Sequence, residues 1–199
     1  MIEIKYIETL KLKRKLKKNS QKISVGSWLQ IPDPNISEIM SRSNFEWLVV
    51  DLEHGSFSKN DMINVFRAIS LGHSLPFARI KNDSKVEIQE ALDSGACGII
   101  IPNIKNEIQL QKAISFSCWP PKGNRGVGFS RANIFGKIFE KYNKFAQNPF
   151  LVAMVECKEG LENIEAISKN NDLDAILIGP YDLSASLGQT GNFKNKKFI

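Results

Sequence analysis

Six short apolar runs recur along the chain, separated by longer stretches of mixed character. The runs are continuous rather than alternating and are rich in Val and Ile, as in Trp47-Leu48-Val49-Val50. Strands that are buried on both faces have this pattern, and parallel sheets bury both faces. The runs therefore predict six strands, at residues 23–29, 46–51, 76–80, 97–102, 150–155 and 174–178.

Helices are predicted between the strands by amphipathic spacing and by residues that favour helix starts. Ser58-x-x-Asp61 and Ser84-x-x-Glu87 have the spacing of a capping box, in which side chains satisfy the first free N–H groups of a helix. Apolar stripes predict further helices at residues 108–114 and 161–167. This alternation of strands and helices favours a parallel α/β fold.

The composition is that of an ordinary folded protein. Of the 199 residues 42% are hydrophobic and 24% charged, so one domain spanning residues 1–199 can bury a core. No apolar stretch predicts a transmembrane helix, and no secretory signal is recognisable at the N-terminus. The cysteines Cys97, Cys118 and Cys157 lack C-x-x-C spacing, which predicts reduced thiols and a cytoplasmic location.

The formal net charge of +6 resides in one segment. Residues 1–20 are expected to form a basic amphipathic helix that packs through Ile7, Leu10, Leu12 and Leu16, with its charged face in solvent. Without interleaved aromatics, this segment does not favour nucleic acid or a membrane surface as partner. Six basic residues account for the whole net charge: Lys11, Lys13, Arg14, Lys15, Lys17 and Lys18.

Ionisable side chains cluster directly after the second predicted strand. Asp51 ends the apolar run, and Glu53 and His54 follow it. One interpretation is a histidine that acts as acid and base and is held by carboxylates. The other is an aspartate that caps the next helix beside a surface histidine. The segment alone does not decide between them.

Arg79, Glu156 and Asp182 also stand at the ends of predicted strands. Arg79 suits a bidentate clamp on a substrate carboxylate, or a surface salt bridge. Glu156 and Asp182 suit a divalent metal that leaves coordination positions free for substrate, or they cap helices. Gly179-Pro180 implies a constrained backbone beside Asp182. Active sites of parallel sheets lie at the carboxyl ends of the strands. Arg79, Glu156 and Asp182 are all predicted to lie at that end of the sheet, as is His54.

A long connection of about thirty residues, 119–148, interrupts the regular alternation. Long connections of this kind are often functional. Arg125 lies in it near two glycines, where it is either an anion contact or an ordinary loop arginine. Asp93, at the end of a predicted helix, is by its spacing alone a helix-end residue.

Four motifs resemble the HpcH/HpaI aldolase family. They are VDLEHG at 50–55, LDSGACGIIIP at 92–102, PPKGNRG at 120–126 and IGPYDLS at 178–184, and they occur in family order over nearly the whole chain. The resemblance implies a (β/α)8 TIM barrel of the phosphoenolpyruvate/pyruvate type, usually assembled into homo-oligomers. It also implies a metal-dependent (class II) aldolase that cleaves or forms 4-hydroxy-2-oxo acids, giving pyruvate and an aldehyde.

The resemblance also assigns roles to particular residues. Glu156 and Asp182 would bind Mg²⁺, Mn²⁺ or Co²⁺, which chelates the carboxylate and 2-oxo group of pyruvate. Arg79 would contact the oxygen that becomes the enolate. His54 would be the acid/base, with Asp51 and Asp93 in its hydrogen-bond network. The substrate would further contact Gly179, Pro180 and Arg125. Family members often have Gln two residues before the metal-binding Glu, where this chain has Met154.

About six βα units are predicted, whereas the family barrel has eight. A six-stranded barrel has two open edges, so we expect weak or no activity from the chain alone unless a partner supplies strands. Two alternatives to the aldolase stay open: a truncated, inactive relative or assembly subunit, and a CoA-thioester lyase of the related citrate-lyase type.

Overall fold

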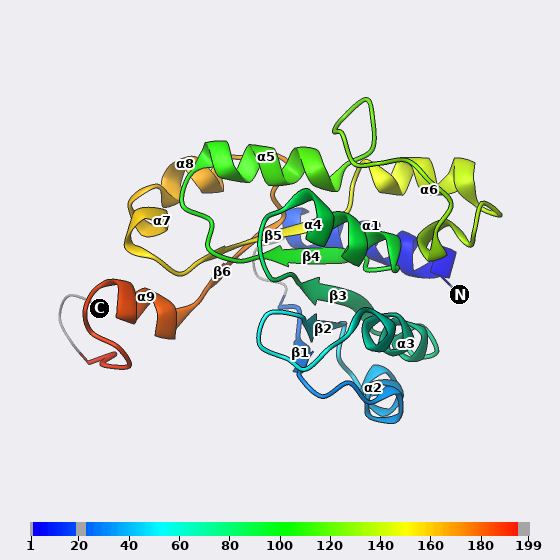
Figure 1. Ribbon diagram of the computed structural model, residues 1–199, viewed down its shortest axis with the longest axis horizontal. Helices are drawn as coiled ribbons and strands as arrows, with labels where there is room; N and C mark the ends of the chain where they lie inside the picture. Colours follow the sequence, from blue (N-terminus) through cyan, green and yellow to red (C-terminus); the bar gives the residue numbers. More distant parts are fainter. Residues whose placement is uncertain (1, 19–22, 195–199) are drawn as a thin grey trace.

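The computed structural model describes residues 2–18 and 23–194 and contains one curled, fully parallel sheet with strand order β1 to β6 (Figure 1). All six predicted strands are confirmed, and together they form an α/β half-barrel. Their bounds are β1 (Gly26–Leu29), β2 (Trp47–Asp51), β3 (Leu75–Arg79), β4 (Gly98–Ile101), β5 (Phe150–Val155) and β6 (Ala175–Ile178).

The helices follow the strands largely as the sequence predicts. Ser58 and Asp61 form the full capping box of α3, whereas Ser84 caps α4 only through its own side chain. A helix between β1 and β2 and another in the long connection were not predicted. The bounds are α1 (Ile2–Lys18), α2 (Pro34–Ser41), α3 (Lys59–Ile69), α4 (Lys85–Asp93), α5 (Glu107–Ser117), the 3₁₀ turn η1 (Arg131–Asn133), α6 (Phe139–Ala146), α7 (Lys158–Glu162), α8 (Ile164–Ser168) and α9 (Pro180–Ser186).

Both faces of the four central strands, β2 to β5, are buried, which explains their continuous apolar runs, whereas β1 and β6 are partly exposed. Leu48 and Val50 point to the face covered by α3, α4 and α5. Val49 and Phe77 point to the opposite, concave face, where α1 and the segment around α6 pack. Every residue of β3 and β5 is buried. Alternate residues of each strand enter different cores, so these strands are apolar except at Arg79, the last residue of β3.

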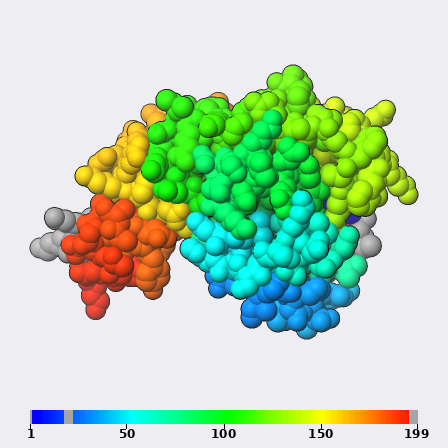
Figure 2. Space-filling model, in the orientation of Figure 1, coloured from blue at the N-terminus to red at the C-terminus, as the bar shows by residue number. Residues whose placement is uncertain are grey.

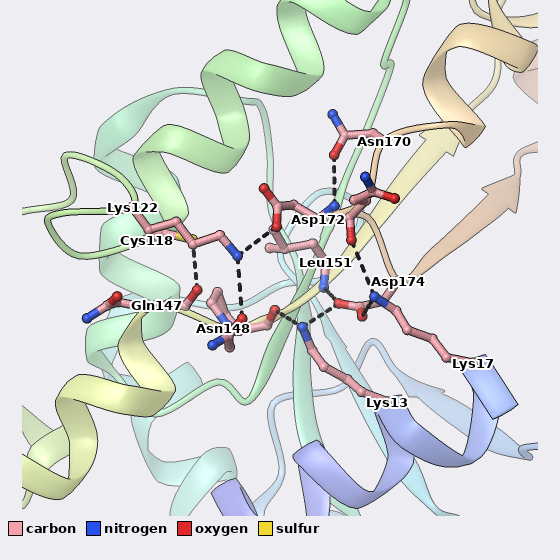
Figure 3. A network of polar contacts seen from close by, with 12 residues as sticks. Lys13, Lys17, Cys118, Lys122, Gln147, Asn148, Leu151, Asn170, Asp172 and Asp174 are labelled. Atoms are coloured by element: carbon pink, nitrogen blue, oxygen red, sulfur yellow. Dashed lines mark hydrogen bonds and ion pairs between the residues drawn. The ribbon is translucent and has the colours of Figure 1, made fainter.

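Helix α1 crosses the amino ends of the strands, and two of its lysines point inward rather than into solvent. Lys5 is 5% exposed, and its Nζ donates to the carbonyl oxygen of Ser74, 3.0 Å away. The Nζ of Lys13 lies 2.7 Å from both the carbonyl oxygen of Pro149 and the carboxylate of Asp174 (Figure 3). The expectation of a solvated basic face is therefore wrong for Lys13, and Lys5, which was not among the six basic residues named, is also buried.

The apolar stripe of α1 also differs from the expected one. Ile2, Tyr6 and Leu12 are buried, but Ile7 is 50% exposed. The inward lysines fit this rotation, since their ammonium groups reach backbone carbonyls at the amino ends of the strands. No helix in the described ranges is long and apolar enough to span a membrane. Within those ranges, β1 and β6 are the edges of the sheet.

We predict that Asp174→Asn lowers the free energy of unfolding by about 3 kcal/mol, because it leaves the buried ammonium of Lys13 without a counter-charge. The side chains of Lys13 and Asp174 are 14% and 2% exposed, and burial lowers the pKa of Lys13 despite the nearby carboxylate. Urea unfolding measures the change. In the matched control, Glu162→Gln, an exposed ion pair with Lys158 is lost, and the change should stay below about 0.5 kcal/mol. Equal effects of both substitutions would contradict the prediction.

Candidate active site

Asp51 and Arg79 form a buried ion pair at the carboxyl ends of β2 and β3. The two residues are direct register partners in the parallel sheet. Arg79 Nε donates to Asp51 Oδ1 at 2.9 Å, and Arg79 Nη2 donates to Asp51 Oδ2 at 2.6 Å. The side chain of Arg79 is 8% exposed and that of Asp51 is 0% exposed. This bidentate geometry fixes the plane of the guanidinium.

The Asp51 carboxylate also holds the turn that follows β2. Its Oδ1 accepts the backbone N–H groups of Glu53 and His54, each at 3.2 Å, and its Oδ2 accepts a hydrogen bond from Gln30 Nε2 at 2.9 Å. Burial raises the pKa of Asp51, but the hydrogen bonds from Arg79, Gln30 and the His54 backbone outweigh it and leave the pKa lowered. Asp51 thus contacts His54 through the backbone.

The guanidinium of Arg79 is held on two further sides. Its Nη1 lies 3.3 Å from Glu53 Oε2, and its central carbon lies 5.0 Å from the ring centroid of Trp28. Burial lowers the pKa of Arg79, but Asp51 and Glu53 outweigh this and raise it. The sequence suggested that Arg79 could clamp a substrate carboxylate with two hydrogen bonds. In the structure the Nε and Nη2 atoms of Arg79 already donate to Asp51, so this edge of the guanidinium is not available for such a clamp. The Nη1 side remains for a ligand.

Glu156 directly follows β5 and is 7% exposed. Its Oε1 accepts the backbone N–H of Asn103 at 2.7 Å, and Asn103 has a left-handed backbone (φ 51°) that favours Asn or Gly. A Cβ on Gly179 would lie 2.8 Å from Glu156 Oε2, so the carboxylate needs a glycine there. Cys157, not Glu156, caps α7.

Asp182 is exposed in the first turn of α9, which follows β6, the strand beside β5. Gly179 is the N-cap residue of α9, so Asp182 does not cap the helix. Burial raises the pKa of Glu156, and the charges of Glu53 and Asp182 raise it further. Burial likewise raises the pKa of Glu53, and Asp182 adds to it. The charges of Asp182 and Glu53 therefore act on Glu156, and the charge of Asp182 acts on Glu53.

His54 is exposed on the turn after β2, and its imidazole makes no hydrogen bond to another described residue. It is therefore free to meet a ligand. Figure 2 shows an indentation of the surface between the α9 segment, in orange and red, and the cyan segment that contains this turn. The carboxyl ends of the strands point toward this part of the molecule (Figure 1).

The carboxyl ends of the strands form the mouth of the half-barrel, and the oxygen donors there suit a hard divalent cation. No three His, Cys, Asp or Glu side chains within residues 2–18 and 23–194 are grouped to hold a metal by themselves. Glu156 and Asp182 supply two carboxylates, and Mg²⁺ commonly binds one or two carboxylates together with substrate and water. Oε2 of Glu53 is buried and accepts no hydrogen bond, although Arg79 lies within ion-pair distance. An acceptor without a donor beside these carboxylates fits a hydrated cation.

Asp93 and Arg125 do not join this cluster within the chain. Asp93 ends α4, which leads back to the amino ends of the strands, and its side chain is hydrogen-bonded to Gln89. Arg125 is 1% exposed and donates from Nη2 to the hydroxyl of Tyr142 at 3.0 Å. Burial raises the pKa of Asp93, although Arg125 opposes the change. The roles expected for Asp93 and Arg125 remain predictions.

Three contributors were absent from the sequence prediction: Trp28, Gln30 and Asn103. Gln30 follows the first predicted strand, so the strand-end rule that selected Asp51 could also have selected it. Asn103 acts through its backbone N–H and Trp28 through its ring face, and neither function leaves a signal in a single sequence.

A family model described as HpcH/HpaI aldolase/citrate lyase matches residues 24–199. A 5-keto-4-deoxy-D-glucarate aldolase from Citrobacter koseri is 32% identical over 174 residues, which is 87% of this chain and 68% of that protein. The crystal structure of an HpcH/HpaI aldolase/citrate lyase family protein from Burkholderia cenocepacia superposes with a TM-score of 0.88 at 28% identity, covering 94% of this chain and 76% of that one. The citrate synthase SbnG superposes with a TM-score of 0.78 at 29% identity, covering 94% and 73%.

We predict that Asp51→Asn lowers the free energy of unfolding at pH 7 by about 3 kcal/mol, because the buried Arg79 loses its bidentate counter-charge and keeps only the longer contact with Glu53. The pKa of Asp51 is lowered from 3.8 in the folded state, so its contribution is present above pH 3.8 and is lost as the pH falls through the folded pKa. The difference in the free energy of unfolding between wild type and variant, measured by urea unfolding, should therefore become smaller as the pH is lowered. Asp172→Asn, on a half-exposed ion pair with Lys122, is the control and should change stability little at any pH. A gap that stays constant down to pH 2 would show that Asp51 is not the titrating group.

Proposed function

Because the chain belongs to the HpcH/HpaI aldolase/citrate lyase family of lyases, we propose that it is a metal-dependent aldolase for 4-hydroxy-2-oxo acids. The products of cleavage are pyruvate and an aldehyde. The observation that carries the proposal is the convergence of His54, the Arg79–Asp51 pair, Glu156 and Asp182 at one end of the sheet.

His54 is the acid/base of the proposed reaction. Its exposed imidazole takes the proton of the 4-hydroxyl group during cleavage and returns it during condensation. The backbone N–H of His54 is bound by Asp51, which places the turn beside Arg79. Glu53 lies close enough for its charge and that of His54 to interact, since His54 lowers the pKa of Glu53 against the larger effect of burial.

Arg79 stabilises the negative charge that develops on the 2-oxo oxygen when the carbon–carbon bond breaks. Its guanidinium is already fixed by Asp51 and by the ring of Trp28, so it needs no reorganisation during the reaction. The Nη1 side, which Asp51 does not occupy and where Glu53 lies at 3.3 Å, is the one that can meet the substrate oxygen. Gly179 and Pro180 would border the substrate where the missing Cβ leaves room beside Glu156.

Glu156 and Asp182 would hold the divalent cation, Mg²⁺, Mn²⁺ or Co²⁺. When bound, such a cation supplies Lewis-acid polarisation of the 2-oxo group. Asn103 and Gly179 keep the Glu156 carboxylate in place, so only Asp182 has to adjust when a ligand arrives. The likeness to the 5-keto-4-deoxy-D-glucarate aldolase supports 2-oxo sugar acids as the substrate class.

A condensation that forms a citrate-like product is the second candidate. It is favoured by the likeness to the citrate synthase SbnG, which has a TM-score of 0.78 to this chain. Both reactions form a carbon–carbon bond beside a carboxylate, so the same residues serve either one. Product analysis separates the two candidates: the aldolase gives pyruvate and an aldehyde from a 4-hydroxy-2-oxo acid, whereas the second candidate gives a tricarboxylic acid and a free thiol from oxaloacetate, water and a two-carbon acyl thioester.

We predict that the purified chain releases pyruvate from 4-hydroxy-2-oxo acids when Mn²⁺ or Mg²⁺ is present, at the weak rate expected of a sheet whose two edges are open in the described part of the chain, and that His54→Ala lowers this kcat by a further factor of about 10²–10⁴. A lactate dehydrogenase-coupled assay over a panel of 2-oxo sugar acids measures both. His73→Ala is the matched control, because His73 follows α3 at the amino ends of the strands. Full turnover in His54→Ala would exclude His54 as the acid/base.

Removal of divalent cations should abolish this activity, and Mn²⁺ should restore it. Asp182→Asn should raise the Mn²⁺ concentration that gives half-maximal rate by at least about 10-fold, since one of two anionic ligands is lost. Turnover that persists after exhaustive chelation would refute the metal dependence. A folded chain that binds Mn²⁺ but never releases pyruvate would favour the inactive relative.

A further inference from the structure

Gln30 directly follows β1, is exposed, and bonds to the buried carboxylate of Asp51. Its Nε2 donates to Asp51 Oδ2 at 2.9 Å, and the same Oδ2 accepts from Arg79 Nη2 at 2.6 Å. The backbone carbonyl oxygen of Gln30 accepts the N–H of Ser56, 3.4 Å away, just after the turn that carries His54. Gln30 thus contacts both the buried ion pair and the segment that carries the proposed acid/base.

The bond to Asp51 fixes which end of the Gln30 amide faces away from the protein. Asp51 accepts hydrogen bonds from Arg79 and from two backbone N–H groups, so it is an ionised carboxylate and can only accept. The amide NH₂ group must therefore face Asp51, and the amide oxygen Oε1 points away from it. Oε1 accepts no hydrogen bond from another residue in the described ranges. Gln30 therefore presents an oriented acceptor to whatever enters the mouth.

The sheet register places Gln30 on the inner, concave face of the half-barrel. Trp28 packs against the concave-face cluster, and its ring lies 5.0 Å from the central carbon of the Arg79 guanidinium. Gln30 stands two residues after Trp28 and so belongs to the same face. Asp51 likewise stands two residues after Val49, the register partner of Trp28. The side chain of Gln30 therefore borders the mouth from the β1 side.

The proposed reaction directs the aldehyde half of the substrate toward this side. The pyruvate half is assigned to Arg79 at the end of β3 and to the carboxylate of Glu156 after β5. The 4-hydroxyl group is assigned to His54, which follows β2. Since the strands lie in the order β1 to β6, the substrate chain beyond its 4-hydroxyl group continues toward the end of β1, where Gln30 lies.

We propose that Gln30 is a specificity residue, whose Oε1 accepts a hydrogen bond from a hydroxyl group on the aldehyde half of the substrate. The proposal rests on the proposed function, because it presupposes that the chain joins pyruvate to an aldehyde. A hydroxylated aldehyde satisfies the oriented acceptor, whereas an apolar aldehyde of the same size displaces water from Oε1 without replacing its hydrogen bond. The site therefore favours hydroxylated aldehydes over apolar ones.

The test is a competition between two aldehydes of equal size. The full chain, with Mn²⁺ and pyruvate, receives equal concentrations of glycolaldehyde and propionaldehyde, which differ by a hydroxyl against a methyl group. Mass spectrometry measures the ratio of the two products, 4,5-dihydroxy-2-oxopentanoate and 4-hydroxy-2-oxohexanoate. Because both aldehydes compete for the same enzyme molecules, this ratio does not depend on how much of the protein is active.

Gln30→Met removes both polar atoms of the amide at nearly constant size. It should lower the ratio of the glycolaldehyde product to the propionaldehyde product by about 3- to 10-fold relative to the wild type, as expected for the loss of one neutral hydrogen bond. Gln147→Met is the matched control. It makes the same change between α6 and β5, at the amino ends of the strands, and should keep the ratio of the wild type.

The outcomes separate this role from the proposed function. An unchanged product ratio in Gln30→Met would refute the role while the aldolase stands. A loss of rate shared equally by both aldehydes would also refute it, since Gln30 would then act only through Asp51 and Arg79 on the pyruvate half that both reactions share. If the wild type condenses neither aldehyde, the proposed function fails and this role with it. Should Gln30→Met not fold, Gln30→Leu lacks the same polar atoms and decides in the same way.

Discussion

The buried pair of Asp51 and Arg79 is the interaction on which the candidate site depends. Two charges at the ends of adjacent strands are costly to bury unless their hydrogen bonds are satisfied. Here the carboxylate accepts from the guanidinium, from two backbone N–H groups and from Gln30. One side chain thus sets the orientation of the arginine and the path of the turn that carries His54. The site is positioned by the sheet register, because the two residues are direct partners in it.

The opposite side of the mouth is organised by backbone rather than by charge pairing. Glu156 is held by the N–H of Asn103, whose left-handed conformation points that group at the carboxylate. Gly179 lets β6 approach closely enough that any larger residue would collide with Glu156. One side of the site is thus rigid through an ion pair and the other through close backbone approach. Asp182 is the exposed member of the set, on a short helix at the end of β6.

The sequence predicts the strands and the end of the sheet at which the ionisable residues gather, because both follow from local pattern. A run buried on both faces must be apolar, and a polar residue after it marks the strand end, as Asp51 and Arg79 do. What the sequence misses depends on distant partners. Lys5 and Lys13 turn inward because carbonyl oxygens many residues away need donors. The bidentate edge of Arg79 meets Asp51 rather than a ligand, and Asp93 pairs with Gln89, for the same reason.

Net charge is a poor guide to the ligand of this protein, because the two ends of the sheet have opposite character. Residues 11–18 of α1 carry a formal charge of +6, equal to the net charge of the whole chain, and α1 lies across the amino ends and uses part of its charge on Asp174 and Glu46. At the carboxyl ends, four carboxylates face a single arginine. Glu156 and Asp182 stand directly before α7 and in the first turn of α9. A basic chain can therefore present a strongly cation-attracting mouth, since only the local field acts on an ion at that distance.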